Sequence, residues 1–67
     1  MNLPKSIRVG MAMRSMGQND LAIATGIHRS NISKMINGKM TITDERLGEI
    51  AAALNMKVSD FVRLGED

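Results

Sequence analysis

The side chains best suited to chemistry in this chain are hydrogen-bond donors and cations gathered between positions 29 and 39. Arg29 and Lys34 carry positive charge, and Ser30 and Ser33 supply hydroxyl groups on the same stretch. An arginine can donate two parallel hydrogen bonds to a pair of acceptors, whereas a serine discriminates less between its partners. Such a set favours the binding of a polyanion through charge and hydrogen bonds.

The charge of the chain is divided between two regions. In residues 1–40, six lysines and arginines stand against one acidic residue, which gives a net charge of +5. In residues 41–67, three cations stand against six acidic side chains, so the net charge is −3. A basic region joined to an acidic one indicates a surface for a polyanion and a second surface with another role. From charge alone, a scatter of solvated side chains is an equally good interpretation.

Composition excludes several kinds of protein. The 67 residues include no cysteine and a single histidine, His28, so neither a disulfide nor a metal site is expected. No apolar run approaches the roughly 20 residues of a membrane span, and none has the length that a signal peptide needs. A catalytic triad needs a nucleophile, a base and an orienting residue that meet in a pocket, and so small a helical chain leaves little room for a cleft. No glycine-rich phosphate loop is present either. We therefore expect one cytoplasmic domain over residues 1–67 that is not an enzyme and uses no cofactor or small-molecule ligand.

The spacing of apolar residues predicts an all-α fold of five short helices, because no stretch alternates as a β-strand would. Pro4 suits the first turn of the first helix, and Gly17 is expected to end that helix. The second helix is predicted at about 18–25 and the third at about 29–36. The residues expected to face inward from these three helices are Leu3, Ile7, Met11, Ala12, Met16, Leu21, Ala22, Ile32, Met35 and Ile36.

The second half of the chain continues the helical pattern. Asn37 and Gly38 both tolerate the left-handed conformation and are expected to end the third helix. Thr43 is a typical N-cap for the fourth helix, which Asn55 is expected to end. The fifth helix is predicted at about 58–64. The inward-facing residues expected in this half are Leu47, Ile50, Ala51, Leu54, Phe61, Val62 and Leu64.

Residues 18–38 have the spacing of a helix-turn-helix. Ala22 is small enough for two helices to cross closely, and Gly26 can take the positive φ of the turn between them. Ile27 would fill the corner, and Ile32 would anchor the second helix so that its other face points outward. An outward face of this kind can lie in the major groove of DNA.

This stretch resembles the helix-turn-helix of the lambda-type phage repressor and Cro family, a group of small bacterial and phage regulators. The resemblance covers about 55 of the 67 residues and extends to Phe61, which is similar to a residue of the family's fifth helix. Its implication is a small stand-alone, Cro-like protein. The residues that resemble the family's fourth helix are Leu47, Ile50, Ala51, Ala53, Leu54, Asn55 and Met56.

The resemblance also implies where the chain contacts DNA. The positions similar to those that touch base edges in the family are Arg29, Ser30, Ser33 and Lys34. The positions similar to those beside the DNA backbone are Gln18, Asn19, Asn31, Asn37 and Lys39. Arg29 and Lys34 could instead be ordinary solvated charges, but the motif favours contact. His28, at the end of the turn, is more typical of a capping or solvated residue.

The sequence departs from the family pattern in two respects. Many members pair an arginine of the first helix with a glutamate at the end of the third, and here those positions hold Met11 and Ile36. Replacing a buried ion pair by packed apolar groups is often neutral or stabilising. Gly17 and Lys57 stand where a capping side chain is usual, so the second and fifth helices are expected to begin less firmly capped.

By its resemblance, the chain is expected to be a sequence-specific transcription regulator, a phage or prophage repressor of the Cro type. Its partner would be a double-stranded DNA operator, and it would repress by blocking polymerase from an overlapping promoter. The alternative is an antitoxin that neutralises a toxin partner and regulates its own synthesis, although only residues 65–67 remain for contact with a toxin.

One recognition helix reads few base pairs, so two copies are expected on the operator, about 34 Å apart. The surface expected to pair them, in a weak homodimer, is the connection before the fifth helix, formed by Met56, Lys57 and Val58. The alternative for Met56 and Val58 is that they cover the core of their own monomer.

Overall fold

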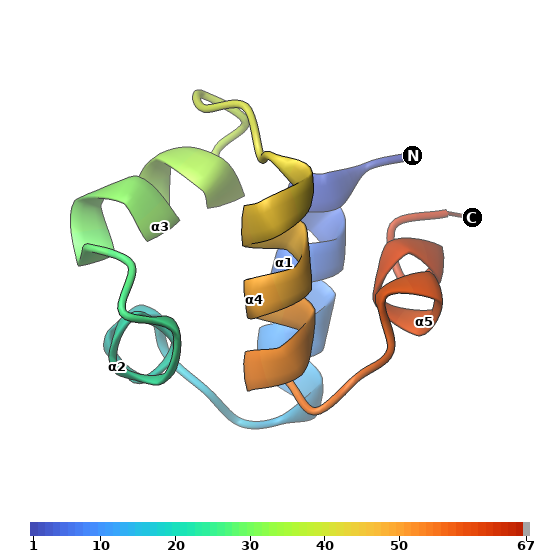
Figure 1. Cartoon of the computed structure of the whole chain (residues 1–67), viewed down its shortest axis with the longest axis horizontal. Coiled ribbons are helices and arrows are strands. Elements are labelled where there is room, and N and C mark those ends of the chain that lie inside the picture. The colour runs from blue at the N-terminus through green and yellow to red at the C-terminus, as the bar shows by residue number, and fades with distance from the viewer. Residues whose placement is uncertain (67) are drawn as a thin grey trace.

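In the computed structural model, which describes residues 1–66, the chain forms five α-helices and no strand within that range (Figure 1). Asp67, the last residue of the domain predicted over 1–67, lies outside the described residues. The all-α fold expected from the sequence is confirmed, and no helix in the described range has the length and apolar character that crossing a bilayer requires. The helices are α1 (Leu3–Met13), α2 (Gln18–Thr25), α3 (Arg29–Ile36), α4 (Asp44–Ala53) and α5 (Val58–Arg63).

The first helix begins as predicted but ends earlier. Asn2 Oδ1 accepts a hydrogen bond from the Lys5 backbone N–H at 3.1 Å. Pro4 stands in the first turn, where a missing N–H leaves no bond unmade. The prediction that Gly17 ends this helix is wrong, because Ser15 takes the left-handed conformation, with a φ of 54°.

Ala12 corrects the apolar stripe predicted for α1, because its side chain is exposed. A helix turns by about 100° per residue, so Met11 lies only about 40° around the axis from Ile7, whereas Ala12 lies about 140° away. Met11 and Ile7 are buried as expected. Met16 lies beyond the end of the helix and is still partly buried against the core.

One core joins all five helices. The α2–α3 pair packs against α1 through α3 and against α4 through α2, while α5 contacts both α1 and α4 from the other end of the molecule (Figure 1). The buried apolar residues are Ile7, Met11, Leu21, Ile27, Ile32, Met35, Ile36, Ile50, Ala51, Leu54 and Phe61. Other residues predicted to face inward are half-buried around this core: Leu3, Met16, Ala22, Leu47, Val62 and Leu64.

The starts of the helices follow the capping residues that the sequence offers. Thr43 Oγ1 accepts from the Arg46 backbone N–H at 3.2 Å, which confirms the predicted N-cap of α4. Gly17 and Lys57 provide no side-chain cap, as expected. The missing side-chain cap of α2 is partly compensated, because the Gly17 N–H donates a hydrogen bond to Asp20 Oδ2 at 2.8 Å.

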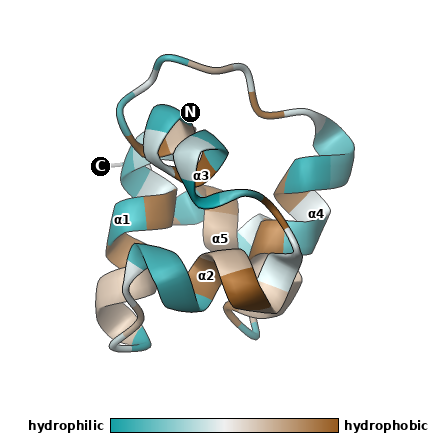
Figure 2. Ribbon diagram, turned by 90° about the vertical axis from the view of Figure 1, so that its left-hand side faces the viewer, coloured by the Kyte–Doolittle hydropathy of each residue, from teal (hydrophilic) through white to brown (hydrophobic). Residues whose placement is uncertain are grey.

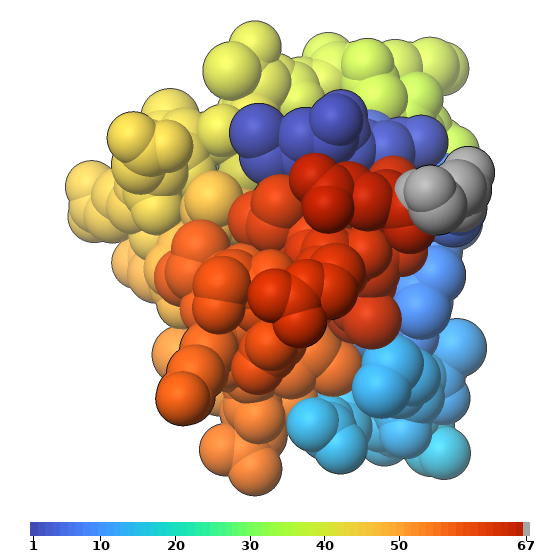
Figure 3. Space-filling model, turned by 90° about the vertical axis from the view of Figure 1, so that its right-hand side faces the viewer, coloured from blue at the N-terminus to red at the C-terminus, as the bar shows by residue number. Residues whose placement is uncertain are grey.

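The two ends of the described chain pack against each other. Ser6 is fully buried, and its hydroxyl donates to the Val62 carbonyl oxygen at 3.3 Å. Gly65 sits so close to α1 that a Cβ there would collide with the backbone carbonyl of Asn2 and with the Ser6 hydroxyl. In Figure 3 the first residues lie directly beside the last ones, on the face formed by α5.

Candidate nucleic-acid interface

The turn between α2 and α3 has the geometry that its residue types predict. Gly26 adopts a φ of 75° and closes α2 in the left-handed conformation. Thr25 Oγ1 donates to the Leu21 carbonyl at 2.8 Å and accepts from the Ile27 N–H at 3.1 Å, so one hydroxyl joins the end of α2 to the turn. Ile27 is 2% exposed and fills the corner, and Ala22 packs against the core. These contacts confirm the predicted roles of Gly26 and Ile27.

The N-terminus of α3 is capped by His28. Its Nδ1 accepts from the Ser30 backbone N–H at 3.1 Å and lies 2.8 Å from Ser30 Oγ. This confirms the capping role expected for the single histidine. The cap also fixes the backbone at the end of α3 where Arg29 and Ser30 project into solvent.

The two faces of α3 differ in the way that its spacing predicts. Ile32, Met35 and Ile36 are buried against the core, each at most 8% exposed. Among the residues expected to touch bases, Arg29, Ser30 and Lys34 are exposed and Ser33 is half-buried. The structure therefore brings these four side chains together on the outer surface of one helix of eight residues.

The residues expected beside the DNA backbone lie around this surface. Asn19, Asn37 and Lys39 are exposed, whereas Gln18, in the first turn of α2, and Asn31 are half-buried. The structure thus gathers this set from three places: the start of α2, the side of α3 and the loop after α3. Viewed from the side of α2 and α3, α2 is hydrophilic at its start and more hydrophobic toward its end (Figure 2).

The loop after α3 begins with a C-cap built on Gly38. The Lys39 N–H donates to the Lys34 carbonyl at 2.8 Å and the Gly38 N–H donates to the Met35 carbonyl at 3.2 Å, a Schellman motif. Gly38 alone takes the left-handed conformation, with a φ of 71°. The prediction that Asn37 and Gly38 end the helix is confirmed, with Asn37 as the C-cap. Asn37 itself has a φ of −90°, and its side-chain amide donates to the Ser33 carbonyl.

Arg8 is a residue that the sequence interpretation assigned to no site. Its Nη1 donates to the Ile36 carbonyl oxygen at 3.0 Å, so it joins α1 to the last residue of α3. The apolar pair predicted there, Met11 and Ile36, is buried in the core. The only sequence signal for Arg8 is a cation one turn before Met11, and the spacing of α1 does not show which carbonyl that cation reaches.

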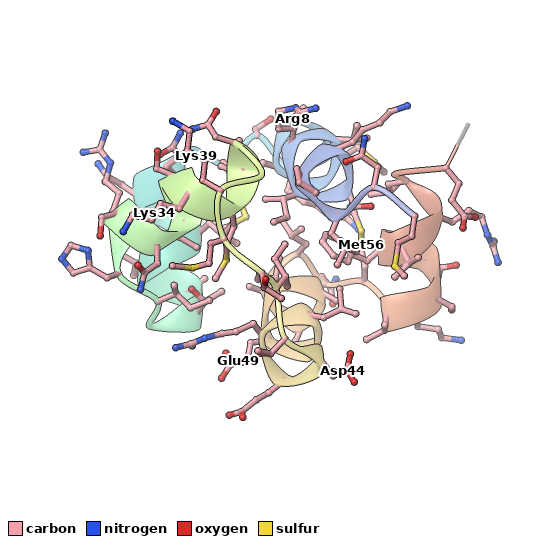
Figure 4. All side chains as sticks on the ribbon, turned by 90° about the horizontal axis from the view of Figure 1, so that it is seen from above. Arg8, Lys34, Lys39, Asp44, Glu49 and Met56 are labelled. Atoms are coloured by element: carbon pink, nitrogen blue, oxygen red, sulfur yellow. The ribbon has the colours of Figure 1, made fainter. Side chains whose placement is uncertain are left out.

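Charges are separated across the molecule as the sequence halves indicate. Seen from above, Arg8, Lys34 and Lys39 lie on one side and Asp44 and Glu49 on the other (Figure 4). The basic side coincides with the exposed surface of α3 and the loop that follows it. A polyanion is therefore attracted to the side of the molecule that presents hydrogen-bond donors.

Comparison with known protein families decides to which family the chain belongs. A family model described as the Cro/C1-type HTH DNA-binding domain matches residues 6–67. The chain belongs to that family. Comparison with curated proteins gives no significant match, and comparison with solved structures gives none either.

As a Cro/C1-type helix-turn-helix domain, the chain binds DNA. In such a domain α2 and α3 form the helix-turn-helix, and the resemblance expected from residues 18–38 is confirmed over nearly the whole chain. The observations on α3 gain a functional meaning from this assignment. Its buried face fixes the helix to the core, and its exposed face carries charge and hydrogen-bond donors.

Proposed function

We propose that this protein is a transcription repressor of the Cro type that binds an operator as a dimer and blocks polymerase from an overlapping promoter. The observation that carries the proposal is the division of α3, with three buried apolar residues on one face and exposed Arg29, Ser30 and Lys34 on the other. A rigid helix that presents a short set of donors is suited to reading base edges in the major groove.

Within this proposal, Arg29 is the main determinant of sequence. It is exposed at the first position of α3, and the N-terminal residues of a recognition helix contact base edges. A guanidinium can bind guanine O6 and N7 together, which distinguishes guanine from the other bases. Ser30 adds a hydrogen-bonding group beside it in the first turn, and Ser33 and Lys34 add others on the next turn of the same helix.

The DNA backbone is held around the recognition helix. Gln18 and Asn19 offer amide donors at the start of α2, and Asn31 and Asn37 offer them along and after α3. Lys39 adds a charge in the loop after the Schellman motif. Contacts to phosphate position the protein but carry little sequence information, so these residues set affinity and register rather than specificity.

The proposed dimer surface lies at the connection between α4 and α5, on the face seen in Figure 3. Lys57 is exposed and Val58 is 43% exposed at the first position of α5. Met56 is half-buried and packs against its own core, so it offers a partner only part of its side chain. A contact this small supports weak association that becomes strong when both copies occupy one operator.

Selection of bound duplexes from a random DNA pool tests the proposal. The selected sites are expected to be palindromic, with half-sites centred about one helical turn apart. Affinity for the selected site should exceed affinity for random DNA of equal length at every salt concentration. Sites without symmetry would contradict the dimer, and a pool that shows no enriched sequence would contradict specific recognition altogether.

The dimer surface has its own test. Val58→Asp should weaken binding to the full operator and leave binding to an isolated half-site unchanged. Met13→Asp is the matched control, because Met13 is another exposed apolar residue, 56% exposed, on α1. Equal losses on the full site and the half-site for Val58→Asp would place the dimer contact elsewhere.

A further inference from the structure

Two arginines of the α1 region bind the carbonyl oxygens at the ends of two other helices. Arg14 Nε donates to the Leu54 carbonyl at 2.8 Å, at the C-terminus of α4. Arg8 Nη1 donates to the Ile36 carbonyl at 3.0 Å, at the C-terminus of α3. The last carbonyls of a helix lack partners inside the helix and carry partial negative charge, so a cation is favourable at both places.

The two arginines differ in what surrounds them. Arg8 lies at the end of the recognition helix, on the same side of the molecule as Lys34 and Lys39 (Figure 4). Arg14 is attached to α4, the helix that carries Asp44 and Glu49. A guanidinium has five N–H donors, and within residues 1–66 the carbonyl of Ile36 is the one hydrogen-bond acceptor that Arg8 meets. The side chain is exposed, so its other donors face solvent on the basic side.

We infer that Arg8 is a positioning residue that binds a DNA phosphate and the C-terminus of α3 at the same time. This inference rests on the proposed function, since it requires α3 to be the helix that reads DNA. One nitrogen of the guanidinium stays on the Ile36 carbonyl, and the remaining donors take the phosphodiester. The contact to the DNA backbone and the orientation of the recognition helix are then coupled through a single side chain.

The chemistry of the α3 terminus supports this role. Without a cation, the carbonyls at that end would repel a nearby phosphate, because the C-terminus of a helix is the negative end of its dipole. Arg8 offsets this charge directly, and Lys39 follows Ile36 by three residues. A planar guanidinium can serve two acceptors in fixed directions, whereas a lysine ammonium acts as a point charge. We therefore expect Arg8→Lys, which keeps the charge, and Arg8→Met, which removes it, to affect DNA binding differently.

The experiment measures binding of wild-type protein and variants to the selected operator and to a random duplex of equal length, over a series of salt concentrations. Arg8→Met should lower operator affinity by about tenfold, the scale of a lost charged hydrogen bond. It should also reduce the slope of log K against log salt by about 0.9, as expected for one lost phosphate contact. Because α3 is less well held, the ratio of operator to random affinity should fall too.

Arg14→Met is the matched control, since it removes the same kind of bond from α4. It should cost similar stability in urea unfolding and leave the salt slope and the affinity ratio unchanged. Arg8→Lys should keep the salt slope and lower the affinity ratio. If Arg8→Met does not fold, as judged by circular dichroism, Arg8→Lys decides the matter alone, and an unchanged ratio there overturns the inference.

The same data separate this inference from the proposed function. If wild-type protein shows no preference for any sequence, the proposed function fails before Arg8 is considered. If wild-type protein discriminates but Arg8→Met and Arg14→Met bind alike, the protein reads DNA and Arg8 has only a structural role.

Discussion

The two ends of this molecule share one core and carry opposite kinds of surface. At the α2–α3 end, Arg8, Arg29, Lys34 and Lys39 form no ion pair with any residue of the described chain. At the α4–α5 end, Arg46 pairs with Glu49 at 2.9 Å and Arg63 approaches Asp60 at 3.7 Å. Two cations of the α4–α5 end thus have an acidic partner on their own helix, whereas none of the four at the α2–α3 end has one within residues 1–66.

This contrast shows that a chain of 67 residues can carry two surfaces of different charge on one core. Surface ion pairs of the kind seen on α4 and α5 contribute little stability, about 0–1 kcal/mol each. They neutralise part of the charge on α4 and α5. Unpaired cations such as those around α3 attract phosphate groups at long range, and this attraction weakens as the salt concentration rises.

The largest expected effect breaks the core that both ends share. Met11 is 8% exposed and lies on the buried side of α1. Met11→Arg should destabilise the fold by about 3–5 kcal/mol, because it buries an unpaired charge. Adding Ile36→Glu should recover part of the loss. Met13→Arg, on the exposed side of the same helix, is the control and should change stability by no more than about 0.5 kcal/mol.

The measurement for this prediction is the urea midpoint of unfolding. A Met11→Arg midpoint equal to that of the wild type would mean that position 11 is not enclosed by the core. A double variant less stable than Met11→Arg would mean that the two positions do not interact favourably.

An effect of intermediate size is expected on DNA affinity, and it should differ between variants at the two ends of the molecule. Arg29→Ala should cost about 1–3 kcal/mol on the operator and relax specificity at one base pair. Lys39→Ala should weaken all sequences alike and reduce the salt slope by about 0.9. Arg46→Ala, at the α4 end, should alter neither quantity. Titrations against operator and random DNA check all three, and equal losses on both DNAs for Arg29→Ala would assign that residue to the backbone.

The smallest expected effect concerns the start of α3. His28→Ala removes the acceptor for the Ser30 N–H and should cost about 1 kcal/mol of stability. His28→Asn supplies another capping oxygen and should restore most of the loss. Thermal unfolding of the two variants measures the difference. An asparagine variant as unstable as the alanine variant would show that the imidazole contributes through packing rather than capping.

The sequence predicted the helix-turn-helix well because short-range chemistry determines it. Gly26 supplies the left-handed turn, Ile27 the plug and Ile32 the anchor, and each requirement depends on residues only a few positions apart. The starts of α3 and α4 were predictable for the same reason, since His28 and Thr43 cap helices that begin immediately after them.

Other features were not predictable because they depend on the whole fold. Gly17 was expected to end α1, yet the chain turns earlier, at Ser15, and Met16 then packs against the core. The bond from Arg8 to Ile36 spans 28 positions, so the spacing of charges along α1 cannot indicate it. The exposure of Arg29, by contrast, follows from the motif, because it stands at the first position of α3.

The close packing of the two chain ends has a practical consequence for labelling. Asn2 and Gly65 meet on the α5 side, and α2 and α3 lie on the opposite side of the core (Figure 1). A label attached at either end therefore leaves the residues of α2 and α3 unmodified. A donor dye at one end and an acceptor dye at the other would begin close together in the folded protein and separate on unfolding. Energy transfer between them would therefore report global unfolding of the domain.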